Sequence, residues 1–318
     1  MKKWVLVLLV VCVVGLSGRV WGFPGTTGVL NGVEDYVTGA FPPPGLYFMN
    51  YLLFYDADCI TNADGHSIDG TEATVIAEAL RFIYSSKIKV LGGNLGWHTV
   101  IALVHKDIQI QNAGLGLNID ESLSGVGDIY VSPFILAWHL PNNWHITIGE
   151  DVILPTGEYD KDKVAALGPM PRAVNPNIGT HHYTFESVVA VTKIFPENGL
   201  VLDAKLMYDI HTEEPDSDIK TGDQFHVDFA ATVPIVPGDE GKGALRAGIN
   251  GYYFTSLEED EYKGDDIDDS KERVFAIGPM VRYEFTPATS LTFKAQFEQN
   301  VHNRPEGEAF WVKLVHAF

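Results

Sequence analysis

The sequence predicts an all-β protein: a transmembrane, antiparallel, up-and-down β-barrel of about twelve strands, of the outer-membrane type. Three observations predict this fold: a secretory signal at the amino terminus, a succession of segments with two-residue periodicity, and connections that alternate between short and long. No stretch after the signal is apolar for long enough to cross a membrane as a helix. Because only helices and closed barrels satisfy every backbone polar group in lipid, a membrane location requires a barrel.

The amino terminus has the composition of a secretory signal. Lysines at positions 2 and 3 precede an apolar run from Trp4 to Gly15, and a short stretch leads to Gly22, after which we place the cleavage site. The apolar run is shorter than the roughly 18–20 residues that a spanning helix needs, which disfavours a retained anchor. Cys12 follows a valine where a lipoprotein signal needs a small residue, so lipidation is disfavoured too. Residues 1–22 are therefore the predicted signal peptide.

The charge and cysteine content of the mature chain exclude several classes of function. After cleavage the chain keeps 19 of its 22 basic residues and all 42 acidic ones, a net charge of −23. So acidic a chain is not expected to bind nucleic acid, which requires clustered Lys and Arg. Only Cys59 remains, so no intramolecular disulfide can form, and the sequence assigns this thiol no role.

Two regions follow the signal. Residues 23–44 are rich in Gly, Pro, Thr and Val and lack periodicity, and they end in Pro42-Pro43-Pro44. We expect them to form an amino-terminal arm, either a plug of the barrel or a periplasmic segment. Residues 45–318 form the predicted barrel. Its twelve strands are expected at Gly45–Asp56, Glu72–Lys89, Trp97–Gln111, Gly127–Leu140, Trp144–Leu154, Thr180–Phe195, Gly199–Glu213, Gly222–Val236, Gly243–Leu257, Arg273–Thr286, Ser290–Val301 and Gly307–Phe318.

The connections between these strands alternate in length. Those after the even-numbered strands are short and carry Gly, Pro or Asn, as tight turns do. They are Val90–Gly96, Pro141–Asn143, Pro196–Asn198, Pro237–Lys242 and Pro287–Thr289. Those after the odd-numbered strands are mostly longer, such as Asn112–Val126 and Pro155–Gly179. Outer-membrane barrels have short periplasmic turns and longer external loops, so the alternation favours this fold over a soluble sandwich.

Acidic residues gather in the long connections. Glu258–Glu261, Asp265–Asp269 and Glu213–Asp218 are the densest clusters. Carboxylates on loops can bind Ca²⁺, but no EF-hand spacing is present. A solvated acidic mouth is therefore the preferred interpretation, and cation binding remains the alternative.

The strands alternate between an apolar and a polar face, as expected for a wall between lipid and a watery lumen. The polar positions supply the candidate lumen-lining residues Asp203, Lys205, Asp209, His226, Asp228, Arg246, Arg282, Glu284, Lys294 and Glu298. Their mixed charges can offset one another inside the barrel, and direct contact with a solute is the alternative role. Aromatic residues near strand ends, namely Tyr253, Phe254, Tyr283, Phe285 and Phe318, are expected in girdles at the lipid interface.

The last strand has the features of a closing strand recognised by the barrel-assembly machinery. Phe310, Val312, Leu314 and Phe318 alternate toward the predicted lipid face and form the expected assembly signal. Trp311 and Lys313 then face the lumen. The expected macromolecular partners are this machinery and outer-membrane lipids.

The sequence contains no recognisable catalytic or metal-binding motif. Neither Gly-x-Ser-x-Gly nor His-Glu-x-x-His occurs. The doublet His181-His182 has Glu186 four positions on but no nearby cysteine, so a metal site there is disfavoured. We expect no catalytic residue, no metal and no cofactor, although barrel enzymes that act on lipids exist.

Several short stretches resemble a known family. They are Pro43–Tyr47, Gly125–Asp128, Leu154–Asp160, Asp216–Asp228, Gly248–Tyr253, Gly278-Pro279 and Arg304–Leu314. Together they resemble the phenol meta-pathway degradation (MetA-pathway, SphA-like) family of outer-membrane β-barrels. The resemblance implies a barrel in the outer membrane of a Gram-negative bacterium that passes hydrophobic or aromatic compounds, and it supplies no catalytic residues.

The expected function is passive uptake of small hydrophobic or aromatic molecules. A non-transporting barrel, either surface-binding or structural, is the alternative, with charged pairs filling the lumen. A barrel enzyme acting on lipids is a third possibility. The sequence does not specify the substrate or the oligomeric state.

Overall fold

The computed structural model describes residues 31–114, 116–166, 174–239 and 243–318. The predicted signal peptide and residues 23–30 of the predicted arm lie outside the described residues. In the described part of the chain, no helix is long and apolar enough to cross a membrane.

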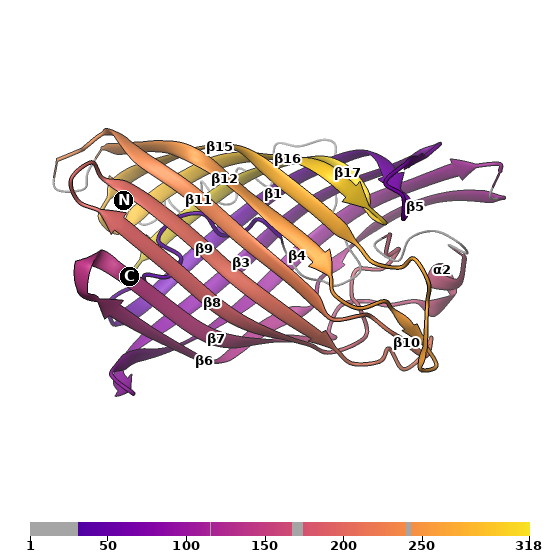
Figure 1. Cartoon of the computed structure of the whole chain (residues 1–318), viewed down its shortest axis with the longest axis horizontal. Coiled ribbons are helices and arrows are strands. Elements are labelled where there is room, and N and C mark those ends of the chain that lie inside the picture. Colours follow the sequence, from indigo (N-terminus) through magenta and orange to yellow (C-terminus); the bar gives the residue numbers. More distant parts are fainter. Residues whose placement is uncertain (1–30, 115, 167–173, 240–242) are drawn as a thin grey trace, which may run out of the picture.

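Twelve long antiparallel strands form a closed barrel (Figure 1). They are β1 (Gly45–Thr61), β3 (Thr71–Val90), β4 (Gly93–Asn112), β6 (Ile129–Leu140), β7 (Trp144–Leu154), β8 (Thr184–Phe195), β9 (Leu200–His211), β11 (Gln224–Val236), β12 (Ala244–Ser256), β15 (Arg273–Thr286), β16 (Thr289–His302) and β17 (Pro305–Ala317). Each pairs with the next in the chain, and β17 pairs with β1, from Tyr47 opposite Ala317 to Ile60 opposite Pro305. The barrel therefore has no free edge along its wall, as the prediction of a twelve-stranded closed barrel requires.

The two ends of the barrel differ. At one end the turns are short: β3 and β4 are joined by Leu91 and Gly92 alone, with φ of +51° and +81°. Positive φ at both positions of a two-residue loop is the geometry that matches the twist of paired strands. Another turn at this end is the 3-10 segment η1 (Pro141–Asn143). The predicted turn Val90–Gly96 is thus too long, because β4 begins at Gly93.

The other end carries the longer connections, which include short strands and one short helix. They contain β2 (Ser67–Ile68), α2 (Lys161–Ala166), β10 (Ile219–Lys220), β13 (Glu261–Tyr262) and β14 (Asp265–Asp266). The last two pair with each other, and β13 also pairs with β10, so two acidic connections form a small separate sheet.

One predicted loop is wrong. Residues Asn112–Val126 contain the strand β5 (Leu117–Val126), which pairs with the second half of β4 from Leu103 to Asn112. This hairpin extends beyond the barrel rim (Figure 1). Beyond the rim neither face of a strand meets lipid, so both faces can carry polar residues. The strand β5 therefore lacks the apolar alternation of the wall strands, and its Asn, Asp, Ser and Gly content resembles that of a loop. Two strand starts are also displaced: β6 begins at Ile129, not Gly127, and β8 begins at Thr184, not Thr180.

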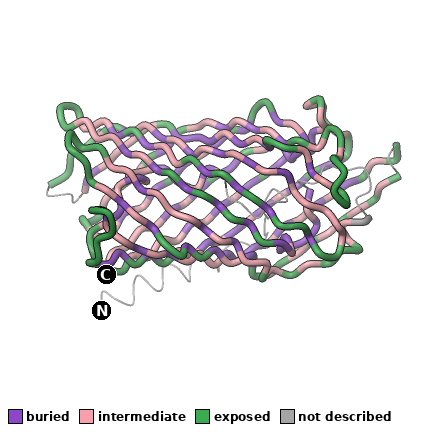
Figure 2. Tube along the Cα trace, turned by 60° about the horizontal axis from the view of Figure 1, so that its bottom comes forward, coloured by how far each residue is buried: buried purple, intermediate pink, exposed green. Residues whose placement is uncertain are grey.

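Burial alternates along each strand, as Figure 2 shows. In β8, for example, Thr184, Glu186 and Val188 are buried while the residues between them are exposed. The large apolar side chains of the outer face remain exposed; among them are Phe82, Leu103, Phe185, Leu206, Ile249, Val281, Phe293 and Phe310. An apolar outer face around a partly polar interior is the arrangement of a barrel surrounded by lipid.

One predicted girdle residue faces inward. Phe254 is fully buried and lies 6.0 Å from the ring of His226, measured between ring centroids. It lies two and four residues after Tyr252 and Asn250 on the same strand, and both of these residues are also buried. Side chains two apart on a strand point the same way, so this position cannot reach lipid. Tyr283, Phe285 and Phe318, by contrast, are exposed, and Tyr253 is partly exposed.

Candidate functional site

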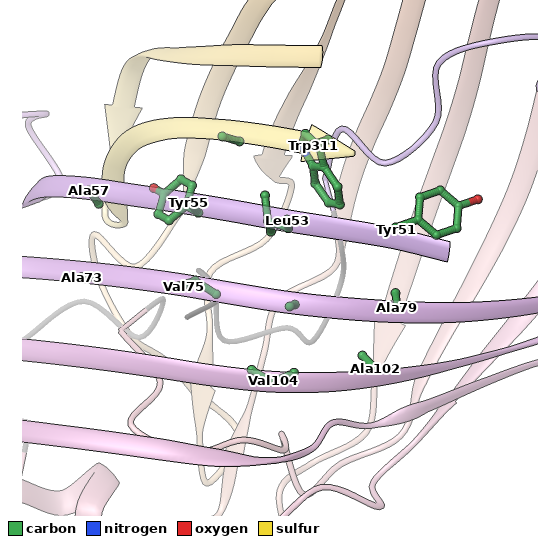
Figure 3. Packing of buried hydrophobic residues seen from close by; sticks show 12 residues of the cluster. Tyr51, Leu53, Tyr55, Ala57, Ala73, Val75, Ala79, Ala102, Val104 and Trp311 are labelled. Atoms are coloured by element: carbon green, nitrogen blue, oxygen red, sulfur yellow. The ribbon is translucent and has the colours of Figure 1, made fainter. Parts of the chain in front are cut away.

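The interior of the barrel has an apolar stripe on one side. Twelve buried residues of β1, β3, β4 and β17 form one cluster (Figure 3): Tyr51, Leu53, Tyr55, Ala57, Ala73, Val75, Ala77, Ala79, Ala102, Val104, Ala309 and Trp311. Six of them are alanine, whose side chain leaves the most space after glycine's. Val33 of the predicted arm and Ile178 of the long connection after β7 pack against this apolar stripe.

The other side of the interior is polar and holds the candidates predicted from sequence. Asp203, Lys205, Asp209, His226, Asp228, Arg246, Arg282, Glu284, Lys294 and Glu298 all lie on the inner face of β9, β11, β12, β15 or β16. They separate into a group that binds the arm and a group that forms networks within the wall.

The described part of the arm, residues 31–44, lies inside the barrel and contacts charged side chains of its wall. The Glu34 carboxylate pairs with Arg81 of β3, and it lies 3.2 Å from the Lys313 Nζ of β17. Asp35 lies 3.1 Å from the same Nζ and 3.2 Å from the Lys294 Nζ of β16. Lys313 and Lys294 are almost completely buried, so these pairs form away from bulk water. Burial acts to raise the pKa of Glu34, but Lys313 and Arg81 hold that pKa well below its ordinary value.

The arm backbone is bound as well. Asp228 accepts hydrogen bonds from the N–H groups of Gly32 (2.7 Å) and Glu34 (2.9 Å). Asp203 accepts one from the N–H of Thr38 at 3.0 Å. The wall lysine Lys294 donates to the carbonyl oxygens of Gly32 and Val33. Wall carboxylates thus accept hydrogen bonds from N–H groups of the arm, and a wall lysine donates hydrogen bonds to carbonyl groups of the arm.

At Gly39 the arm backbone lies directly against the backbone of the wall. Its N–H donates to the Thr192 hydroxyl at 2.9 Å, and its carbonyl accepts from the Thr147 hydroxyl at 3.0 Å. A Cβ at this position would lie 2.6 Å from the backbone nitrogen of Thr192. Only glycine therefore fits here without moving the wall.

Tyr36 places an aromatic ring between two arginines. The guanidinium carbon of Arg282 lies 4.5 Å from the ring centroid, and that of Arg246 lies 5.1 Å from it. Cations at such distances from an aromatic ring are attracted by its π face. Arg282 also donates to Glu284 at 3.3 Å, and Arg246 donates to the carbonyl of Gly199 at 2.6 Å.

The remaining predicted residues form networks within the wall. His226 Nε2 lies 3.0 Å from Asp209 and 3.4 Å from Glu186, which lies 3.4 Å from Lys205. Separately, Glu298 accepts hydrogen bonds from the hydroxyls of Tyr55 and Tyr252. These contacts satisfy charges that would be costly to bury alone.

Two groups of residues have the donor atoms that a metal could use. Ligand atoms of Glu186, Asp209 and His226 lie within 4.8 Å of one another, as do those of His181, Glu214 and Asp216. In the first group Lys205 and a protonated His226 can already offset the two carboxylates. In the second, Glu214 is held by the backbone N–H groups of Asp216 (3.0 Å) and Ser217 (2.6 Å). In both groups the carboxylates already have cationic or hydrogen-bonding partners in the chain, so we assign no metal to either.

A cavity of about 520 Å³ lies between the arm and the wall toward the short-turn end. Arm residues Tyr36 and Phe41 line it together with apolar Ile83 and Ile135, and the charged side chains around it include Arg282. A smaller cavity of about 50 Å³ lies nearer the apolar stripe. Both border the ion pair of Glu34 with Arg81.

Sequence reasoning missed several residues of this site. Arg81 lies in a predicted strand but is absent from the lumen candidates, and His98 pairs with Asp151 at 2.9 Å on strands where no candidate is named. Glu34 belongs to a segment without periodicity. The signal that could have found it is the pair Glu34-Asp35, the only acidic residues of an arm otherwise made of Gly, Pro and uncharged side chains.

Comparisons with known structures agree with the fold. An outer-membrane channel from Pseudomonas putida F1 aligns with a TM-score of 0.70 at 16% identity, covering 90% of this chain and 100% of that one. The β domain of the Bordetella autotransporter BrkA gives 0.49 at 8% identity, covering 87% and 100%. The monoaromatic hydrocarbon channel CymD gives 0.42 at 9%, covering 94% and 98%. Only the first of these scores is high enough to support the fold, and we draw no inference from the other two.

The sequence itself places the chain in a family. No curated protein is significantly similar to it. The sequence model of the family described as "Putative MetA-pathway of phenol degradation" matches residues 57–314, which is most of the chain and nearly all of the barrel. With its apolar outer face and closed twelve-stranded wall, the protein is a barrel of the bacterial outer membrane. The chain belongs to the family "Putative MetA-pathway of phenol degradation".

Proposed function

We propose that the protein is an outer-membrane channel for the passive uptake of small hydrophobic or aromatic compounds, and that the arm is its plug. The observation that carries the proposal is the lumen, which combines an apolar stripe with a separate segment held by polar contacts. Had the barrel only a structural role, its interior could be filled by wall side chains, as in small barrels. Here residues 31–44 fill it, and they leave a cavity beside them.

The apolar stripe supports uptake of apolar solutes. A polar pore lining would offer a hydrocarbon ring no favourable contact, whereas buried apolar surface stabilises it by about 25 cal/mol per Å². The stripe along β1, β3 and β4 presents mostly small apolar side chains to the lumen. Family membership is consistent with this solute class, since the family description refers to phenol degradation.

Solute flux through reconstituted protein tests the proposal. Liposome swelling is measured with the mature chain and with a variant lacking residues 23–44, using benzamide as a small uncharged aromatic solute. We expect flux in both, and a larger flux without the arm. No flux in either protein would refute the transport function and favour the alternative, a non-transporting barrel.

We also propose that Phe310, Val312, Leu314 and Phe318 form the assembly signal read by the barrel-assembly machinery. In β17 and the residue that follows it, Phe310 and Phe318 are exposed, while Trp311 and Lys313 are buried. Apolar side chains that face outward at the last strand are available to a partner before lipid surrounds them.

We propose no catalytic activity for this protein. Ser187, for example, donates a hydrogen bond to Glu150 on the outer face and has no histidine partner among its described hydrogen bonds.

A further inference from the structure

Three cations of the barrel wall obtain their carboxylate partners from the arm. Arg81, Lys294 and Lys313 pair with Glu34 or Asp35. Among the described residues, no carboxylate of the wall lies within 4.0 Å of these three groups. Lys205, a partly buried lysine nearby, pairs instead with Glu186 on the neighbouring strand of the wall. The arm therefore supplies the carboxylates that pair with these three cations, whereas the nearby wall carboxylates Asp203 and Asp228 accept hydrogen bonds from the arm backbone.

Displacement of the arm would leave these cations without counterions. Removing one partner of a buried ion pair is strongly destabilising, because the other charge stays in a poorly solvated place. A neutral hydrocarbon passing through the lumen could not offset that cost. An anion that enters the vacated space could, since it would restore the charge-assisted hydrogen bonds that the arm gives up.

The residue next to these carboxylates adds a second requirement. The ring of Tyr36 contacts the guanidinium groups of both Arg246 and Arg282, which lie opposite each other on β12 and β15. Guanidinium groups bind aromatic faces through both charge and stacking. The segment Glu34-Asp35-Tyr36 therefore offers the wall carboxylates and a phenol ring from three consecutive residues.

We propose that the solute of this channel is an aromatic carboxylate, and that Glu34, Asp35 and Tyr36 occupy its binding position when the arm is docked. Arg81, Lys294 and Lys313 bind the carboxylate, and Arg246 and Arg282 bind the ring. The cavity of about 520 Å³ borders three of these five side chains, namely Arg81, Lys313 and Arg282, and also Tyr36, so a solute reaches the site from beside the arm. Cavities of roughly 300–1,000 Å³ hold compounds larger than a single ring. This inference rests on the proposed uptake function and specifies its substrate class.

Three solutes of similar size separate the contributions of charge and ring. Benzoate has both, benzamide has the ring without the charge, and cyclohexanecarboxylate has the charge without the aromatic ring. Their fluxes are measured in the same proteoliposomes, with protein-free liposomes subtracted. We expect benzoate to pass about tenfold faster than benzamide, which corresponds to one charge-assisted hydrogen bond, and to pass faster than cyclohexanecarboxylate.

Variants assign these preferences to the residues. Lys294→Met with Lys313→Met should lower the ratio of benzoate flux to benzamide flux toward one, while release of the arm raises benzamide flux itself. Arg246→Gln with Arg282→Gln should make benzoate and cyclohexanecarboxylate equal. Arg273→Gln is the matched control, because Arg273 lies on β15 but contacts Asn300 and His302. It should retain both preferences.

Two outcomes distinguish the inference from the function on which it rests. If benzamide passes but benzoate passes no faster than benzamide, the substrate class is wrong and the channel function stands. The same conclusion follows if benzoate is faster and Arg273→Gln abolishes the preference as fully as the lysine variants do. If no solute passes with the arm present or deleted, the channel function fails and the inference fails with it.

Discussion

Replacing Lys313 with methionine tests whether ion pairs hold the arm in the lumen. Methionine keeps the length and apolar stem of lysine but removes the charge that Glu34 and Asp35 share at 3.2 and 3.1 Å. Two hydrogen bonds to charged groups contribute about 1.5–3 kcal/mol each. Because Glu34 keeps Arg81 and Asp35 keeps Lys294, the lower end applies, and the loss is about 3 kcal/mol. That corresponds to a rise of roughly 100-fold in the undocked population.

The rate at which a cysteine on the arm is labelled reports this population. Val33→Cys is placed in a Cys59→Ser background, since Cys59 is the other thiol of the mature chain. A membrane-impermeant maleimide reacts with the thiol introduced at position 33 only when the arm leaves the apolar stripe. Lys263→Met is the control, because its pair with Asp218 at 3.5 Å is exposed on both sides and should contribute little. A labelling rate that changes less than about threefold in the Lys313→Met variant would show that the ion pairs do not hold the arm, because the expected rise is roughly 100-fold.

The other predictions use the same protein. Gly39→Ala should undock the arm while the barrel stays folded, since its Cβ would meet the backbone of Thr192 at 2.6 Å; fast labelling with unchanged heat-modifiable gel mobility would show this, and slow labelling would contradict it. Acidification should release the arm only at low pH. Lys313 and Arg81 outweigh burial and hold the pKa of Glu34 well below 4.5, so its stabilising contribution is complete above pH 4.5 and is lost as the pH falls through the lowered value. The labelling rate, divided at each pH by that of a freely exposed thiol to remove the thiolate dependence of the maleimide reaction, should therefore be constant between about pH 5 and 8. A rise of this ratio as the pH falls within that range would contradict the assignment. Deletion of Phe318 should reduce the fraction of chains inserted in the membrane, with Phe318→Tyr as control; normal insertion of the deletion would refute its role in assembly.

The sequence specifies the barrel because the barrel is a repeating structure. Each strand must place apolar residues outward at every second position, and each short turn needs residues that bend the chain. Both signals are local, so the strands after Trp144 could be located within a few residues. Where the hairpin of β4 and β5 leaves the membrane, the outward face meets water and the apolar signal ends, and there the prediction of a loop was wrong.

The candidate site could be predicted only in part, for a related reason. Polar residues on the inner face, such as Asp228 and Lys294, can be recognised in the sequence because they occupy every second position of a strand. Their partners Glu34 and Asp35 lie in a segment without periodicity, and Glu34 is 194 residues away from Asp228 in the chain. No local pattern can specify which wall residue an irregular segment will contact. At Phe254 the two signals conflicted: its aromatic character suggested the interface, but its position on the strand, two residues from the inward-facing Tyr252, places it inside.

The attachment of the arm to the last strands has a consequence for biogenesis. The arm is joined to β1 at its carboxyl end, yet its carboxylates bind Lys294 of β16 and Lys313 of β17, which are the last strands to be synthesised. These two lysines and Arg81 come together only after β17 has paired with β1. An unfinished or misregistered barrel therefore has no complete binding position for the arm. Docking of the arm therefore requires a closed wall, because its binding position includes residues of both the first and the last strands.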